Sequence, residues 1–356
     1  MCRCQAPGIV VGYAQDATDC PVYAPAQPQL GPGTIREEPG RREGLLALRA
    51  QRLDAGREGA STAIRGTAEP MERPIVVGVD GSQGSLEAAA WAGAEAALRG
   101  APVRIVHTAL QWDYYVPLVP QPDPWSAAVA EAAQEMLQEA TNRTRAGHPG
   151  VQVSTELVQG GPSEALVAVA EEAQLIVVGS RGRGGFAGLL LGSVSWQVVS
   201  RARCPAVVVR DPHARPTGQV VVGVTGRPDQ GPVLDFAFRE AELRGADLRV
   251  LHAWTRPAGI GPGGTSPLPY DVEAVGREEE VLLAESIAGW RDQFPDTRLI
   301  QQVVHEHPAK ALIDASADHD LTIVGAHGGA RALLGLGSVA HALVHHARGP
   351  VAVVRH

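Results

Sequence analysis

The chain has 356 residues, of which 44% are hydrophobic and 20% charged, and its formal net charge is −8. This length suits two domains with an additional tail. The negative charge argues against a nucleic-acid partner, because phosphate backbones are bound by basic surfaces. No run of about 18 apolar residues occurs, so we expect no membrane span and no membrane partner.

The four cysteines form no recognisable framework. They are Cys2, Cys4, Cys20 and Cys204. Without a Cys-x-x-Cys pair, this spacing favours neither a disulfide scaffold nor a zinc site. We therefore expect a reducing compartment and a cytoplasmic location.

Residues 1–70 differ from the rest of the chain. They are rich in Pro, Gly and Arg and have no apolar periodicity, which is typical of a disordered tail. The alternative is a mis-assigned start, because Met71 stands just before the first strong strand signal at Ile75. We expect no function in this segment.

From Ile75 onward, strand and helix patterns alternate. We expect strands over 75–80, 103–108, 151–158, 175–178 and 206–209, and helices over 85–98, 125–145, 162–173 and 194–201. The residue pattern of 151–158 alternates, and Gly100 is a helix-ending signal. Strands separated by such helices imply right-handed βαβ units and a parallel sheet.

The pattern then repeats after a linker. Equivalent residues lie 145 positions apart: Ile75–Asp80 matches Val220–Thr225, Gly100 matches Gly245, Gly192-Ser193 matches Gly337-Ser338, and Pro205 matches Pro350. A register kept over a whole domain indicates a tandem duplication. We therefore expect two domains, at residues 71–211 and 219–356.

The most informative stretch is the strand 175–178 with the glycine-rich loop that follows it. The loop ends at Gly192-Ser193, directly before a helix. A strand, a glycine loop and a helix N-terminus are typical of a phosphate site, since free N–H groups there point at the anion. We expect Ser193 to be the N-cap of the helix.

A carboxylate stands at the end of the first strand. Parallel sheets bind ligands at the carboxyl ends of their strands, where the strand order reverses. Asp80 has that position and can accept hydrogen bonds from a nucleotide or hold Mg²⁺ with the phosphates. The alternative is that Asp80 caps the next helix.

The spacing Gly179-x2-Gly182-x9-Gly192-Ser193 resembles the ATP-binding pattern of the universal stress protein family. The flanking residues Val76–Ser82, His107 and Cys204–Val209 agree with it. The resemblance covers about residues 73–356, as two tandem domains.

The resemblance implies an α/β fold of two doubly wound domains, each a five-stranded parallel sheet in the order 3-2-1-4-5 with helices on both faces. It implies an adenine nucleotide site for ATP, with Mg²⁺ as an optional companion. The residues carried over are Asp80 at the ribose or phosphates, Thr108 and Val178 beside the adenine, and Gly179, Gly182, Gly192 and Ser193 at the phosphates, with Ser195 as a further hydroxyl.

The resemblance also implies that the two domains form an internal pseudo-dimer. The last strands, 206–209 and 351–354, are apolar and would pair with each other. A homodimer of the whole chain is left open.

The second copy departs from the family pattern. It keeps Gly325, Gly328, Gly337 and Ser338, but its loop is one residue shorter. Thr225 stands where the first copy has Asp80, and Ala340 replaces Ser195. We expect the first domain to bind ATP, and the second to bind it weakly or not at all.

Chemistry-bearing groups are scarce elsewhere. No Walker lysine follows the loop, and the dinucleotide-like segment from Gly182 follows the wrong strand. His341 and His345 are spaced i, i+4, and we interpret them as a solvated helix face. Three hypotheses stay open: an ATP-binding stress-response or signalling protein, which we favour, a slow Mg²⁺-dependent ATPase or phosphotransfer enzyme, and a nucleotide-independent interaction module.

Overall fold

The computed structural model describes residues 73–109, 127–183, 190–210, 216–227, 230–255, 271–326 and 335–355. The first domain contains β1 (Ile75–Val79), α2 (Gln83–Arg99), β2 (Val103–Ala109), α3 (Ala127–Arg145), β3 (Val153–Gln159), α4 (Pro162–Val169), a 3₁₀ turn (Ala170–Glu172), β4 (Leu175–Gly179), α5 (Ser193–Arg201) and β5 (Ala206–Val209). The expectations for residues 1–70 and for Gly328 lie outside the described residues.

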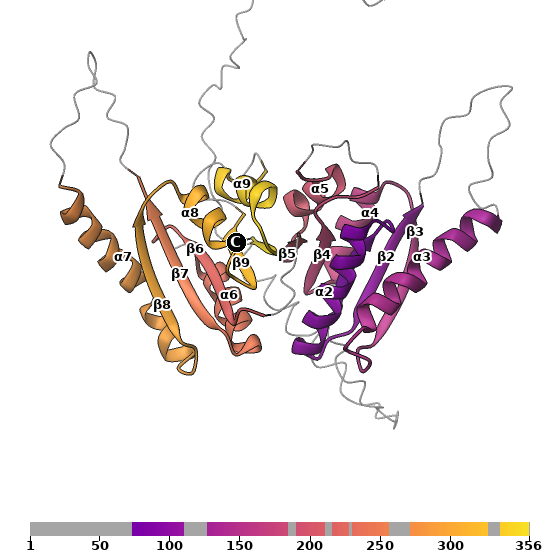
Figure 1. The fold of residues 1–356 in the computed structure, drawn as a ribbon, viewed down its shortest axis with the longest axis horizontal. Helices are drawn as coiled ribbons and strands as arrows, with labels where there is room; N and C mark the ends of the chain where they lie inside the picture. The colour runs from indigo at the N-terminus through magenta and orange to yellow at the C-terminus, as the bar shows by residue number, and fades with distance from the viewer. Residues whose placement is uncertain are drawn as a thin grey trace, which may run out of the picture. The chain divides into compact units, whose positions relative to one another are not determined.

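The second domain repeats this order (Figure 1). It contains β6 (Gln219–Val224), α6 (Gly231–Arg244), β7 (Asp247–Trp254), α7 (Val272–Gln293), β8 (Leu299–His305), α8 (Pro308–Ala315), β9 (Leu321–Gly325), α9 (Ser338–His346) and β10 (Val351–Val354). Both helix-ending glycines have the left-handed conformation at the C-cap, with φ of 66° at Gly100 and 58° at Gly245.

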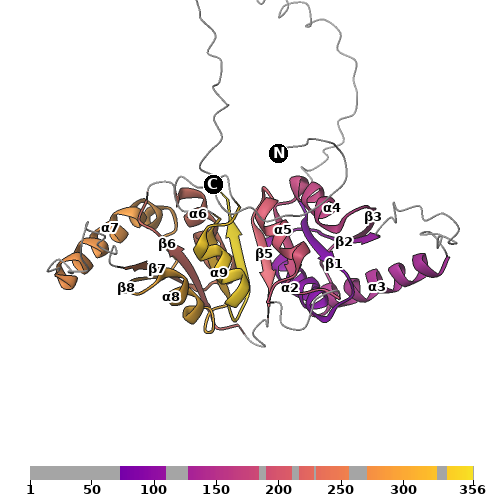
Figure 2. The ribbon, with the colours of Figure 1, turned by 90° about the horizontal axis from the view of Figure 1, so that it is seen from above.

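The ten strands of the described residues form one sheet in the order β3-β2-β1-β4-β5-β10-β9-β6-β7-β8. Within each domain neighbouring strands are parallel, so the expected 3-2-1-4-5 order is confirmed. The two domains join where β5 and β10 pair antiparallel, with Ala352 opposite Val207. Figure 2 shows these two strands side by side at the centre, so the expected pseudo-dimer pairing is also confirmed.

The central strands are apolar along their whole length because helices cover both faces of the sheet. All five residues of β1, and all five of β4, are buried. Alternate side chains enter two separate cores: Val77 packs with residues of α2 and α3, and Val76 packs with residues of α4 and α5.

The outer strand β3 differs from the expectation. It begins at Val153 rather than Val151, and its side chains are partly or fully exposed along its length. The position of β3 at the end of the sheet explains this, since an edge strand has a neighbour on one side only. Val151 is buried, but it lies in the turn before the strand.

At one equivalent position, the helices of the two domains carry side chains of very different size. In α2, Gly93 lies so close to α3 that an added Cβ would stand 2.0 Å from the Thr144 carbonyl oxygen. The equivalent residue of α6 is Phe238, which is fully buried. Its ring stacks on Trp290 and Phe294 of α7, with centroids 5.8 and 5.3 Å apart. One helix pair is therefore in backbone contact, and the other is packed through aromatic rings.

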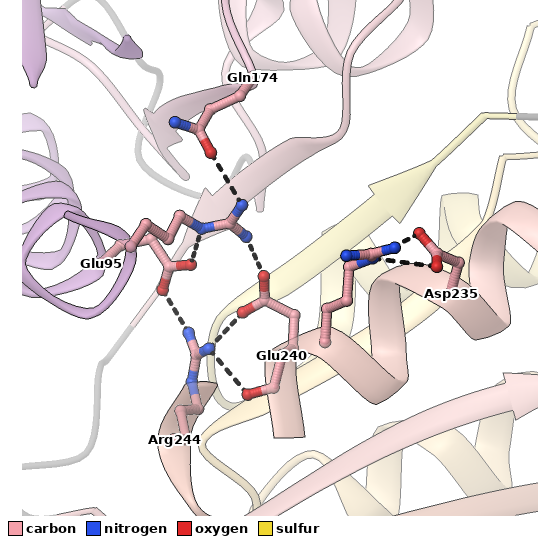
Figure 3. Close-up of polar contacts among 7 residues, drawn as sticks. Glu95, Gln174, Asp235, Glu240 and Arg244 are labelled. Carbon is pink, nitrogen blue, oxygen red and sulfur yellow. Dashed lines mark hydrogen bonds and ion pairs between the residues drawn. The ribbon is translucent and has the colours of Figure 1, made fainter. Parts of the chain in front are cut away.

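A buried cluster of four charged side chains joins α2 to α6, and we call it the charge quartet (Figure 3). Its members are Glu95, Arg99, Glu240 and Arg244, and Glu240 and Arg244 lie 145 residues after Glu95 and Arg99. Each arginine pairs with the glutamate four residues earlier on its own helix and with the glutamate of the other helix. The carboxylates are 1% and 0% exposed, so the arginines provide the compensation that burial of a charge requires.

The charge quartet predicts a pH dependence of stability. Burial, and then the negative charge of Glu95, raise the pKa of Glu240 from 4.5 to about 7, against the opposing effect of the two arginines. The folded chain therefore takes up a proton at a higher pH than the unfolded chain. Stability from this group is full below pH 4.5 and is lost as pH rises through 7, by on the order of 1–3 kcal/mol.

Urea denaturation of the wild type and Glu240→Gln between pH 5 and pH 8 measures this effect. We expect the neutral side chain to remove that part of the pH dependence. If the unfolding free energy of the variant changed with pH as steeply as that of the wild type, the proton would be taken up by another group.

Candidate functional site

The end of β1 turns sharply into α2. Gly81 has a φ of 74°, which favours glycine, and the hydroxyl of Ser82 accepts a hydrogen bond from the Ser85 N–H at 3.2 Å. Ser82 is thus the N-cap of α2. The alternative that Asp80 caps this helix is wrong.

Asp80 instead joins the β1 turn to the glycine loop that follows β4. One carboxylate oxygen accepts from the Ser82 N–H at 3.0 Å, and the other accepts from the Arg183 N–H at 2.8 Å. The Ser82 hydroxyl donates to the Arg181 carbonyl at 3.3 Å. Because β1 and β4 are neighbours, these contacts lie at the reversal of strand order, where such sheets bind ligands.

The electrostatics favour an ionised carboxylate at this point. Burial raises the pKa of Asp80, but hydrogen bonds from Ser82 and Arg183 outweigh burial, so the pKa lies below its ordinary value. Asp80 is therefore a fixed acceptor at neutral pH.

Close packing explains two of the glycines. A Cβ at Gly179 would stand 2.6 Å from the backbone of Gly84 in the first turn of α2, and a Cβ at Gly182 would stand 2.2 Å from an Asp80 carboxylate oxygen. These glycines let the end of β4 and its loop approach the β1 turn. Gly192 has only ordinary contacts, and its N–H donates to the Ser180 carbonyl at 2.8 Å.

The N-terminus of α5 opens beside this loop. The expectation that Ser193 caps it is wrong, because the N-cap is Gly192 and Ser193 is the first helical residue, with its side chain exposed. The N–H groups of the first turn have no intrahelical partner, as at any helix start. Ser195 is buried, and its hydroxyl donates to the Gly179 carbonyl at 2.6 Å, which ties α5 to the end of β4.

The two positions carried over to the adenine lie on strands that flank this centre. Thr108 lies near the end of β2 and pairs with Val158 of β3. Val178 is a buried core residue of β4 that pairs with Gly78 and Val208. The neighbouring His107 donates from Nδ1 to the Val79 carbonyl at 2.8 Å and so anchors the end of β1.

Sequence reasoning missed the contacts that Arg183 and Ser82 make at this site. Arg183 contributes its backbone N–H to Asp80, and its guanidinium donates to the Gly81 carbonyl. No sequence signal pointed to this, since the loop can close on Asp80 only once β1 and β4 are neighbours. Ser82 could have been found, because a serine just before an apolar helix is a start signal.

The second copy keeps the backbone arrangement without the carboxylate. Gly226 repeats the positive φ of Gly81, at 72°, and the Gly337 N–H donates to the Ala326 carbonyl at 2.7 Å. Thr225 has the place of Asp80, and its N–H donates to the side-chain oxygen of the buried Gln230 at 2.8 Å. The described end of β9 carries Gly325 in the equivalent place to Gly179.

The contacts of β7 and α7 with the end of β6 are also described in the second copy. His252 donates from Nδ1 to the Val224 carbonyl, as its equivalent His107 does in the first domain. Its other ring nitrogen contacts a Glu279 carboxylate oxygen at 2.8 Å. Leu282 of α7 lies against Gly226, where an added Cβ would stand 2.5 Å from the leucine side chain.

The paired histidines of α9 contact the first domain. The His341 and His345 rings are stacked with centroids 4.6 Å apart, and Trp196 of α5 meets the His341 ring edge-on at 4.9 Å. The interpretation as a purely solvated face is therefore incomplete. Among the described residues, no cluster of three or more metal-binding side chains occurs.

The described part of the chain contains no helix that is both long enough and apolar enough to cross a membrane.

Comparison with known proteins agrees with a chain of two similar domains. The model of the universal stress protein family matches residues 71–210 and again residues 217–355. The chain is 36% identical over 293 residues to universal stress protein Rv2005c of Mycobacterium tuberculosis, covering 79% of this chain and 96% of that one. It is 34% identical over 296 residues to a universal stress protein of Mycolicibacterium smegmatis, covering 80% and 97%.

A solved structure has the same fold. The crystal structure of a universal stress protein from Archaeoglobus fulgidus superposes with a TM-score of 0.58 at 18% identity, covering 79% of this chain and 96% of that one. With two family matches that together span both domains, the chain belongs to the universal stress protein family in a tandem, two-domain form.

Proposed function

We propose that this protein is an ATP-binding stress-response or signalling protein that binds the nucleotide in its first domain. The observation that carries the proposal is the Asp80 carboxylate, which is bonded to the backbone of the glycine loop beside the start of α5. The site combines a fixed negative acceptor with a helix N-terminus, which favours anions.

The two parts suit different ends of a nucleotide. An ionised carboxylate repels phosphate but accepts from the ribose hydroxyls, so Asp80 suits the sugar. The first turn of α5, with the exposed Ser193, suits the phosphates. If Asp80 faced the phosphates instead, Mg²⁺ bound with ATP would neutralise the phosphate charge, and Asp80 would be the carboxylate that helps to hold it.

The second domain lacks this combination. Among its described residues, Thr225 stands in the place of Asp80 and carries no charge. Occupancy of the first domain alone gives the protein two states, with and without nucleotide, and these are the states that a signalling role requires.

The test compares equivalent positions in the two domains. Asp80→Ala is expected to weaken ATP binding about tenfold or more, because a charge-assisted acceptor is removed. Thr225→Ala is expected to change it less than about twofold. Isothermal titration calorimetry of the full chain, with and without Mg²⁺, measures both, and native mass spectrometry counts the bound nucleotides.

The outcomes separate the alternatives. A larger loss in Thr225→Ala would reverse the assignment of domains. No ATP binding by the wild type would favour a nucleotide-independent interaction module. Steady ADP release with Mg²⁺ that disappears in Asp80→Ala would favour slow ATP hydrolysis.

A further inference from the structure

Arg210, the residue after β5, connects the glycine loop of the first domain to the second domain. Its guanidinium donates to the carbonyls of His345 at 2.6 Å and Val344 at 3.1 Å, both in the last turn of α9. It also donates to the carbonyl of Leu190, two residues before Gly192 at the start of α5. One side chain thus bonds both to the end of the glycine loop and to a helix of the other domain.

The contact with α9 has a clear physical basis. The last carbonyls of a helix have no intrahelical partners, and the negative end of the helix dipole attracts a cation. Arginine suits this place because its planar guanidinium carries five donors, so it can bond to several carbonyls at once.

The duplication supplies a matched counterpart. Arg355 follows β10, 145 residues after Arg210, and donates to the carbonyls of Val199 and Ser200 in the last turn of α5. Each arginine therefore caps the C-terminus of a helix in the other domain: Arg210 caps α9, and Arg355 caps α5. They differ at the glycine loops, because no described residue of the second loop accepts a hydrogen bond from Arg355.

The helices joined by these arginines also touch at their first turns. Trp196 of α5 and His341 of α9 are equivalent residues, and their rings are in edge contact. The first turn of α5, which we assign to phosphate, is therefore packed against α9. Arg210 adds a second link between the two, because it bonds both to Leu190, just before α5, and to the last turn of α9.

We propose that Arg210 is a positioning residue that holds Leu190 and the start of α5 in place for phosphate binding and couples the occupancy of that site to α9 of the second domain. The inference rests on the proposed function, because it concerns the same ATP site. It predicts that removing Arg210 affects nucleotide binding more than removing its counterpart Arg355 does.

The experiment uses the full chain as wild type, Arg210→Ala, Arg355→Ala and Asp80→Ala. We expect Arg210→Ala to weaken ATP binding about tenfold, because the segment at Leu190 would lose order that ATP binding must then restore, and Arg355→Ala to change it less than about twofold. The melting temperatures of the two arginine variants should fall by similar amounts, since each loses one helix cap.

Hydrogen exchange separates positioning from simple loss of stability. Without nucleotide, amides of residues 190–195 should exchange faster in Arg210→Ala than in Arg355→Ala. With ATP, the last turn of α9 should change its exchange in the wild type and in Arg355→Ala, but not in Arg210→Ala.

Equal losses of affinity and equal exchange in the two arginine variants would overturn the inference. Failure of the wild type to bind ATP would overturn the proposed function instead. In that case the nucleotide-free exchange of residues 190–195 still decides whether Arg210 positions the loop.

Discussion

Arg244→Ala is expected to destabilise the folded chain by about 3–5 kcal/mol. Arg244 donates to Glu240 on its own helix and to Glu95 on α2. Its removal leaves two buried carboxylates with Arg99 as the remaining guanidinium of the charge quartet. The penalty arises because a charge is left buried without compensation, and one glutamate should then take up a proton.

Chemical denaturation near pH 7.5 measures the change in the free energy of unfolding. The matched control is Arg239→Ala, because Arg239 pairs with Asp235 on the same helix but is 63% exposed. This surface pair is expected to contribute less than about 1 kcal/mol. In the double variant Arg244→Ala/Glu240→Ala, the remaining Glu95–Arg99 pair carries no net charge. The loss of unfolding free energy should therefore be smaller than the sum of the losses in the two single variants. Equal losses in Arg244→Ala and Arg239→Ala would show that the quartet adds nothing beyond a surface pair.

Phe238→Ala is also expected to cost about 3–5 kcal/mol, for a different reason. The ring is fully buried and stacks on both Trp290 and Phe294, so its removal leaves a cavity beside these aromatic side chains. Thermal and chemical denaturation measure the loss. Val281→Ala on the exposed side of α7 is the control, with an expected change within about 0.5 kcal/mol.

At the equivalent position of the first domain, adding a side chain rather than removing one should destabilise the folded chain. Gly93→Ala adds a methyl group against the Thr144 carbonyl and is expected to cost about 1–3 kcal/mol, although alanine is the better helix former. A stabilising effect of Gly93→Ala would contradict backbone contact between α2 and α3.

Much of the fold could be predicted because its signals are local or repeated. Apolar runs such as 175–178 mark strands that are buried on both faces, and the 145-residue register marks the duplication. Gly100 and Gly245 end their helices for a reason that lies in their own conformation. The strand order and the pairing of β5 with β10 came from the family resemblance and are confirmed.

The remaining features depend on contacts between distant segments. Glu95 and Glu240 look like ordinary helix residues, and their burial follows only from the packing of α2 on α6. A Cβ at Gly182 would meet an Asp80 oxygen, a contact between distant segments that the spacing of the glycines does not reveal. Ser193 was misplaced by one position, because serine and glycine are both acceptable N-caps and only the backbone dihedrals decide between them.

The antiparallel pairing of β5 with β10 has a consequence for synthesis of the chain. Val351 is made 145 residues after Ala206, which at about 5–20 residues per second is a delay of roughly 7–30 seconds. During that time the first domain can fold with β5 paired to β4, but the other edge of β5, whose four residues are all buried in the final sheet, has no strand to pair with. Neighbouring nascent chains on one message present the same open apolar edge. Mispairing between nascent chains on neighbouring ribosomes is therefore a risk until β10 has been made and has paired with β5.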